Sequence, residues 1–401
     1  MQNKLKIIND PVHGFIRIPH EILFDIIEHP YFQRLRRISQ TGLLNLIFPG
    51  ATHTRFHHAI GAMHLMFTAL ETLKQKGIKI SEEEEKGAML AILMHDIGHG
   101  PFSHALESML MHDWHHENLS LLLMNRLNDE FDGQLSVAIE MFQGKYHRKF
   151  FNQLISSQLD VDRLDYLKRD SFFTGVSEGN VNTQRIISMM NVCQDELVID
   201  AKGVYSIENF LMARMFMYWQ VYYHKTSALA EFILVKILKR AKYLVSKGID
   251  LPAAENLKYF LSRGKSLATD EDVERFTQMD DNDIIQAMKL WQNSEDFILS
   301  YWCKCVIERN LPKTIISSQP FEKKFIEEKI RNTNELFGID NAEELVHEIE
   351  RSLLPYNTKK QPIYLLQKNG GIIKLDESED QLLSGLIGSN TTRYILTFPR
   401  Q

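Results

Sequence analysis

The chain has few cysteines, no long apolar run and no excess of positive charge, and each absence excludes a class of protein. Cysteine occurs three times in 401 residues, and Cys303 and Cys305 have the wrong spacing for a zinc knuckle and no second pair. No stretch of about 18 uninterrupted apolar residues occurs, so we expect no membrane span. The first residues also lack the apolar segment of a secretory signal. These features indicate a cytoplasmic protein with reduced thiols.

The charge balance argues against a general affinity for nucleic acid. The formal net charge is −6 and the pI is near 6.3, so no broadly basic surface is expected, although local basic pockets can occur. The hydrophobic content of 44% is ordinary for a globular protein, and the length is ample for a large core and more than one domain. Binding of nucleic acid or membrane is therefore not indicated.

Apolar periodicity predicts a mainly α protein. A short hairpin is expected before residue 20, and helices are expected over about 21–29, 31–40, 55–76, 82–96, 102–129, 149–169 and 207–245, with more between 250 and 335. Near the C-terminus, apolar runs flank Asn369-Gly370-Gly371, a pattern typical of a β-hairpin, and residues 393–398 read as a further strand. We divide the chain into a core (1–245), a helical extension (246–317) and a small α+β unit (318–401).

Four side chains have the chemistry and order of a metal site. They are His58, the adjacent pair His95 and Asp96, and Asp162. Imidazoles and carboxylates together suit a divalent ion such as Mn, Fe, Ni, Zn or Mg. The doublet ends a predicted buried helix, so its side chains are expected at the floor of a cavity. Four protein ligands leave positions for water and phosphate, as in a catalytic metal site.

Several segments in a fixed order carry a resemblance to a known family. They are Asn9–Gly14, Phe32–Gln40, Phe48–His53, Arg55–His58, Met94–His104 and Asp160–Tyr166. Together they resemble the HD superfamily of metal-dependent phosphohydrolases. The resemblance is greatest to the branch of deoxynucleoside triphosphate triphosphohydrolases, which includes the animal sterile-alpha-motif/HD enzyme. The likeness covers roughly residues 5 to 230 and implies an HD-domain helical bundle for the core.

The resemblance also implies roles for individual residues. Histidines near neutral pKa can take and give protons, and His104 matches a residue beside the scissile phosphate, assisted by His116 and a carboxylate. That carboxylate is Glu107, where the family has an aspartate, and His99 also matches a pocket histidine. His53, His57 and His115 have no such match. The residues that match contacts to substrate phosphates or sugar are Gln40, Arg55, Arg163 (a lysine in the family), Tyr166, Asp170, Arg214 and Tyr222.

The function we expect is conversion of a dNTP to deoxynucleoside and inorganic triphosphate, with one divalent ion per subunit. Two alternatives stay open. One is hydrolysis of another ester, such as a nucleoside monophosphate, a cyclic dinucleotide or an alarmone. The other is a nucleotide- or nucleic-acid-binding regulator with weak catalysis.

Family members assemble into dimers or tetramers with activating nucleotides between subunits, and we expect a homodimer or homotetramer here. Glu28 and Arg36 match one activator site, and Lys202, His224 and Lys225 fall near another. Two basic family positions are Asn191 and Asp200 in this chain, and Asp200 would repel phosphate.

Overall fold

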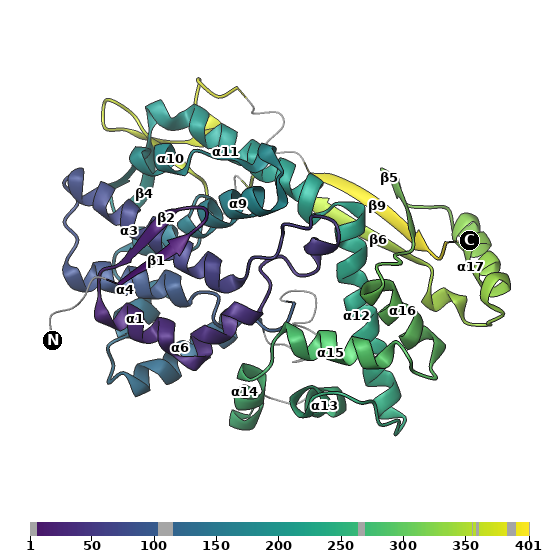
Figure 1. Ribbon diagram of the computed structural model, residues 1–401. Helices are drawn as coiled ribbons and strands as arrows, with labels where there is room; N and C mark the ends of the chain where they lie inside the picture. Colours follow the sequence, from purple (N-terminus) through teal and green to yellow (C-terminus); the bar gives the residue numbers. More distant parts are fainter. Residues whose placement is uncertain are drawn as a thin grey trace.

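The computed structural model describes residues 6–102, 115–263, 269–354, 356–357, 361–382 and 390–400. Helices form most of the molecule, and three small sheets lie among and beside them (Figure 1). The mainly α class predicted from periodicity is confirmed. The N-terminal hairpin packs on the helical core, whereas the sheet of strands 313–317, 347–353 and 391–398 lies with helix 323–337 at the opposite end of the molecule (Figure 1).

The α-helices of the described chain are α1 (Glu21–Glu28), α2 (Pro30–Gln33), α3 (Arg55–Gln75), α4 (Glu82–Met94), α6 (His116–Glu130), α7 (Ser136–Phe142), α8 (Lys149–Ile155), α9 (Val161–Thr174), α10 (Thr183–Met189), α11 (Val204–Met217), α12 (Lys225–Ser246), α13 (Glu255–Ser262), α14 (Asp270–Thr277), α15 (Asp281–Trp291), α16 (Phe297–Ile307) and α17 (Lys323–Phe337). The strands are β1 (Lys6–Asp10), β2 (Gly14–Ile18), β3 (Met190–Cys193), β4 (Glu196–Asp200), β5 (Lys313–Ser317), β6 (His347–Leu353), β7 (Tyr364–Leu366), β8 (Ile372–Lys374) and β9 (Thr391–Phe398).

Helix α4 is the centre of the core. Its start is fixed by a capping box, in which Ser81 accepts from the Glu84 amide and Glu84 accepts from the Ser81 amide. Every residue from Ala88 to Met94 is fully buried, which the all-apolar run predicted. Helices α3 and α7 pack on it. The residues that follow Met94 therefore enter the site from inside the core.

Two predicted helices are shorter than expected, and both breaks shape the site. The helix predicted over 31–40 ends at Arg37, because Ile38 to Gln40 pair with the segment before α3, where the Ile38 carbonyl accepts from the Arg55 amide. The helix predicted over 149–169 is two helices. Asp160 accepts hydrogen bonds from the Ser157 and Arg163 amides, so it caps α9 and the chain before it is extended.

The long helix predicted over 207–245 is also interrupted. Between α11 and α12, Tyr218–Tyr222 wind as a π-helix, and His224 caps α12 by accepting from the Thr226 amide. A π-helical turn often occurs at a functional site. No described helix is long and apolar enough to span a membrane.

The C-terminal strands belong to two different sheets. The predicted hairpin is β7 and β8, and β7 pairs in parallel with β4, giving a sheet of order β3-β4-β7-β8. The predicted last strand, β9, lies between β5 and β6. Strand β5 lies before residue 318 but pairs with β9, which lies after it. Strand β4 lies before residue 245 but pairs with β7, which lies after residue 318. Strand pairing therefore crosses both of the boundaries that we predicted. The division into three domains stays a prediction.

Candidate metal centre and substrate cavity

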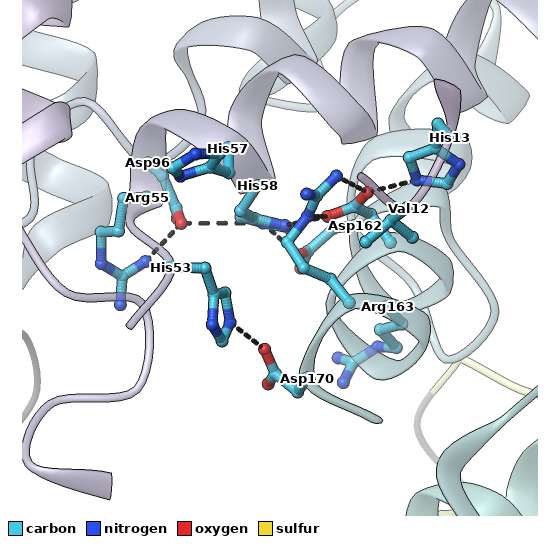
Figure 2. A network of polar contacts seen from close by, with 12 residues as sticks. Val12, His13, His53, Arg55, His57, His58, Asp96, Asp162, Arg163 and Asp170 are labelled. Carbon is cyan, nitrogen blue, oxygen red and sulfur yellow. Dashed lines mark hydrogen bonds and ion pairs between the residues drawn. The ribbon is translucent and has the colours of Figure 1, made fainter. Parts of the chain in front are cut away.

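Three of the four predicted metal ligands meet at one point. Ligand atoms of His58, His95 and Asp162 all lie within 4.8 Å of one another. They come from the first turn of α3, the end of α4 and the first turn of α9. The Nε2 atom of His58 is 3.0 Å from Asp162 Oδ1, and that of His95 is 3.6 Å from the same oxygen. Figure 2 shows His58 lying between the Asp96 and Asp162 carboxylates.

Asp96, the fourth predicted ligand, borders this cluster. Its Oδ1 atom is 3.3 Å from His95 Nε2, and its Oδ2 atom is 3.8 Å from His58 Nε2. Oδ2 also accepts a hydrogen bond from the Arg55 guanidinium (Figure 2). The positive charges of His95 and Arg55 outweigh burial and hold the pKa of Asp96 well below its usual range. Asp96 is therefore ionised beside the other three groups.

The two imidazoles present bare nitrogens to the cluster. The Nδ1 atom of His95 donates to the Ile92 carbonyl at 2.6 Å, and that of His58 donates to Asp165 Oδ2 at 2.8 Å. Because an oxygen acceptor fixes a proton on Nδ1, Nε2 carries the lone pair in the neutral form of each ring, which is the form that binds a metal ion. The buried Nε2 of His95 makes no hydrogen bond to any described residue. Orphaned buried nitrogens of this kind fit a metal ion.

The pKa values of His58 and Asp162 also favour a positive charge at this position. Burial lowers the pKa of His58, but hydrogen bonds to Asp162 and Asp165 outweigh it and raise the pKa to about 10. Burial raises the pKa of Asp162, but the two histidines outweigh it and lower the pKa below the usual range. A positive charge is thus stabilised between the rings and the carboxylates. A divalent ion there would replace the proton.

Behind His58 lies a buried ionic network that the sequence analysis did not assign. Asp165 accepts from His58, from His13 at 2.7 Å, and from the Arg169 guanidinium at 2.8 and 2.9 Å. Arg169 donates in turn to Asp10 at 2.7 Å. A Cβ at Gly61 would lie 2.1 Å from both Arg169 and Asp165, so this glycine makes room for the pair.

The ligands lie at one end of a cavity of about 460 Å³, a volume typical of small-molecule sites. The predicted site residues that line it are His58, Asp96, His99, His116, Asp162, Gln40, Arg55, Arg163, Tyr166, Asp170 and Tyr222. Among the described predicted residues, His95 is buried beneath the lining and Arg214 is not part of it. The Arg214 guanidinium carbon is 5.9 Å from the ring of Tyr218, which lines the cavity. His104 and Glu107 lie outside the described residues.

Two predicted catalytic histidines stack on each other. The rings of His99 and His116 are 4.0 Å apart and nearly parallel. His99 Nε2 is 3.2 Å from Asp96 Oδ1. Burial and the nearby Arg55 hold the pKa of His99 well below its usual range, so this ring is neutral at neutral pH. The position of His99 suits a positioning role, in which the ring holds the Asp96 carboxylate, better than a role in proton transfer.

Asp170, on the cavity wall, is held by two side chains. It accepts from His53 at 2.7 Å through Oδ1 (Figure 2) and from the Tyr222 hydroxyl at 2.5 Å through Oδ2. His53 has no family match in the sequence analysis, yet it is fully enclosed and stacks on Phe173. Gln40 also lines the cavity, and its Oε1 atom is buried and has no hydrogen-bond partner in the described part of the chain.

Arg163 lines the cavity, and its Nε atom is hydrogen-bonded to the loop that precedes α9. Its Nε donates to the Ser157 carbonyl at 2.6 Å and lies 3.3 Å from Asp160. Burial lowers its pKa, but Asp160 outweighs this and raises the pKa above the usual range. The guanidinium is therefore fixed in place and fully charged.

The residues expected at activator sites lie apart from this cavity. Lys225 borders a groove of about 830 Å³. Asp200, which we expected to repel phosphate, is 3.0 Å from Lys76 and accepts from Asn191 at 3.2 Å. Its negative charge is therefore balanced within the chain. Arg36 donates to Gln33, and Glu28 is exposed.

Comparison with known proteins gives a consistent result. A family model described as the HD domain matches residues 55–170, and one described as the HD associated region matches residues 181–252. The uncharacterized protein YwfO of Bacillus subtilis is 32% identical over 407 aligned residues, which cover 98% of this chain and 92% of that protein. Human deoxynucleoside triphosphate triphosphohydrolase SAMHD1 is 29% identical over 329 residues, which cover 71% of this chain and 51% of that enzyme.

A similar chain fold also occurs in a solved structure. The crystal structure of a phosphohydrolase from Bacteroides thetaiotaomicron superposes with a TM-score of 0.95 at 45% identity, covering 99% of this chain and all of that one. The present chain spans about half the length of human SAMHD1.

Proposed function

The chain belongs to the HD-domain superfamily, and we propose that it is a metal-dependent hydrolase that converts a deoxynucleoside triphosphate to the deoxynucleoside and inorganic triphosphate. The observation that carries the proposal is the convergence of two bare imidazole nitrogens and two ionised carboxylates at one end of a cavity whose wall can bind a sugar hydroxyl. The similarity to SAMHD1 enzymes supports the choice of substrate.

His58, His95, Asp162 and Asp96 would hold one divalent ion. Such an ion supplies charge for a phosphoryl oxygen and lowers the pKa of a bound water. The donor set admits Mn, Fe, Ni, Zn and Mg. Asp165 keeps the His58 ring in the tautomer that presents Nε2, and the Ile92 carbonyl does the same for His95.

The reaction breaks the bond between the α-phosphorus and the 5′ oxygen of the deoxynucleoside. Water supplies the new P–O bond, and the leaving 5′ oxygen takes up a proton. We assign that proton to His104, with His116 and Glu107 assisting, on the strength of the family match. Arg55, Arg163 and Arg214 would balance phosphate charge, which arginine does by bidentate hydrogen bonding. His99 would hold Asp96 in place.

The sugar would lie between Gln40 and Asp170. The 3′ hydroxyl can donate its one proton to Gln40 Oε1, which has no partner in the described residues, or to the Asp170 carboxylate. His53 and Tyr222 hold Asp170 in one orientation. The rings of Tyr166 and Tyr222 are 6.4 Å apart and face the cavity, where they would pack on the sugar and exclude a 2′ hydroxyl.

A homodimer or homotetramer with nucleotide activation is part of the same proposal, as is a cytoplasmic location. The groove beside Lys225 is also lined by Arg309, Lys313, Lys329 and Arg400, and none of its lining residues is acidic. Polyphosphate would be attracted there.

The test is direct product analysis. Purified protein with Mn²⁺ is incubated with each of the four dNTPs, and the products are separated by ion-exchange chromatography. We expect inorganic triphosphate and deoxynucleoside in equal amounts, and expect His95→Ala with Asp96→Ala to remove both. Release of orthophosphate or pyrophosphate would point to another ester, and turnover equal to that of the double variant would point to a binding protein.

A further inference from the structure

The cavity continues beyond the sugar wall into a segment that the proposed reaction does not use. Metal ligands line one end and the residues for sugar binding line the middle. The lining also includes Thr41–Leu44, Tyr223 and three residues of α12, which are Ser227, Glu231 and Leu234. If the proposed function holds, the α-phosphate lies at the metal and the sugar lies at Asp170. The nucleobase must then lie in this remaining segment, the base end of the cavity.

One face of α12 supplies polar groups to the base end. Ser227 and Glu231 are four residues apart on α12, which places them on one side of the helix, and Tyr223 lies just before the His224 cap. The Ser227 hydroxyl is buried and has no hydrogen-bond partner in the described ranges, and the same holds for the Thr41 hydroxyl. Buried hydroxyls without partners indicate a polar ligand at this end, because leaving them unpaired costs free energy.

Glu231 is the acidic residue of this end. Arg351, on β6, donates to Glu231 Oε2 at 2.9 Å, which fixes the carboxylate at the cavity wall. The Glu231 side chain is 44% exposed, so it is accessible from the cavity. Oε1 receives no hydrogen bond from a described side chain, which leaves an acceptor for a ligand. The base end therefore offers one carboxylate acceptor and two hydroxyls.

Among the four DNA bases, guanine matches this set. A carboxylate accepts two parallel hydrogen bonds only from adjacent donors, and guanine offers N1–H beside its 2-amino group. The hydroxyls of Ser227 and Thr41 can donate to guanine O6 or N7. Adenine and cytosine each place an unprotonated ring nitrogen beside their amino group, which the carboxylate repels. Thymine has a single N–H between two carbonyls.

We propose that Glu231, with Ser227 and Thr41, selects guanine, so that dGTP is the preferred substrate of the site. This inference rests on the proposed function for the position of the sugar and phosphates. Paired hydrogen bonds to one base edge typically give discrimination of about tenfold to a hundredfold.

The experiment compares dGTP, dITP and dATP in the full-length Mn²⁺ enzyme. Deoxyinosine triphosphate differs from dGTP only in lacking the 2-amino group, so the ratio of their kcat/KM values reports on that contact. We expect a ratio of about ten or more for the wild type and a ratio near one for Glu231→Gln. Glu344→Gln is the matched control. Glu344 is about as exposed as Glu231 and, like Glu231, pairs with a cation, which is Lys236, but it does not line the cavity.

Equilibrium binding separates the two proposals. Calorimetry with the His95→Ala variant measures dGTP and dATP affinity without hydrolysis. A guanine preference in binding, without triphosphate release by the wild type, would sustain the base selection and refute the reaction. Release of triphosphate from all four dNTPs with equal efficiency would sustain the reaction and overturn the base selection. Absence of nucleotide binding would overturn both proposals, whereas a dGTP/dITP ratio that Glu231→Gln leaves unchanged would overturn the base selection alone.

Discussion

The two sides of the His58 ring are built in opposite ways. Behind the ring, Asp165, His13, Arg169 and Asp10 satisfy one another, and all are buried or nearly so. In front of it, His95 Nε2, Gln40 Oε1 and the Ser227 and Thr41 hydroxyls are buried without partners in the described chain. Polar groups that pair with one another stabilise the fold, whereas polar groups without a partner can form hydrogen bonds with a ligand. The same few helices thus provide a rigid support and a reactive surface.

The largest effect on stability is expected behind the ring. Replacing Arg169 by Met removes the guanidinium that lies between two buried carboxylates, Asp10 and Asp165. Breaking a buried pair in this way costs about 3–5 kcal/mol of unfolding free energy, which urea unfolding measures. Arg126→Met, which breaks exposed pairs with Asp270 and Glu274, should cost about 1 kcal/mol or less. Equal losses in the two variants would mean that the network behind His58 contributes no special stability.

A smaller effect on stability, but a clear one on substrate binding, is expected in front of the ring. Tyr222→Phe keeps the ring that packs on the sugar and removes the hydroxyl that donates to Asp170. We expect KM for deoxynucleotides to rise about tenfold, because a hydrogen bond to a charged group contributes about 1.5–3 kcal/mol, while ribonucleotides remain excluded.

Steady-state kinetics with dGTP and GTP would measure both effects. Tyr146→Phe removes a similar bond to Glu84 far from the cavity and should leave KM unchanged. An equal rise of KM in both variants would contradict the role of Tyr222.

The smallest effect concerns pH. Burial, followed by the nearby His13, lowers the pKa of His64 to about 4. The folded protein therefore binds a proton here less readily than the unfolded chain does, so this stability is present above about pH 6.5 and is lost as the pH falls toward 4. His64→Leu should make unfolding free energy less steeply dependent on pH by about one proton between pH 6.5 and 4. Parallel curves for the variant and the wild type would show that His64 does not titrate on unfolding.

The sequence predicted the metal cluster better than the groups around it. Histidine and aspartate at His58, His95 and Asp162 are unusual enough in order and spacing to indicate a shared ion. The sequence assigned no role to Asp165 or Arg169, because their contacts with His13 and Asp10 join segments some 150 residues apart. His53 also looked ordinary, because its role depends on Asp170, 117 residues away.

Helix breaks and strand partners were the other limits of prediction. Periodicity marks the apolar faces of α8 and α9 but does not show that the Asp160 side chain caps the backbone more favourably than a continuous helix would. The predicted hairpin of β7 and β8 is local and was found, whereas its pairing with β4 is a contact across more than 160 residues that composition does not reveal.

The most direct test of the central claim is a crystal structure of the manganese-loaded protein, with anomalous scattering used to locate the ion. The account predicts one ion at about 2.2 Å from the Nε2 atoms of His58 and His95 and from a carboxylate oxygen of Asp162. An ion bound elsewhere, or a site in which the two imidazoles do not share it, would contradict the account.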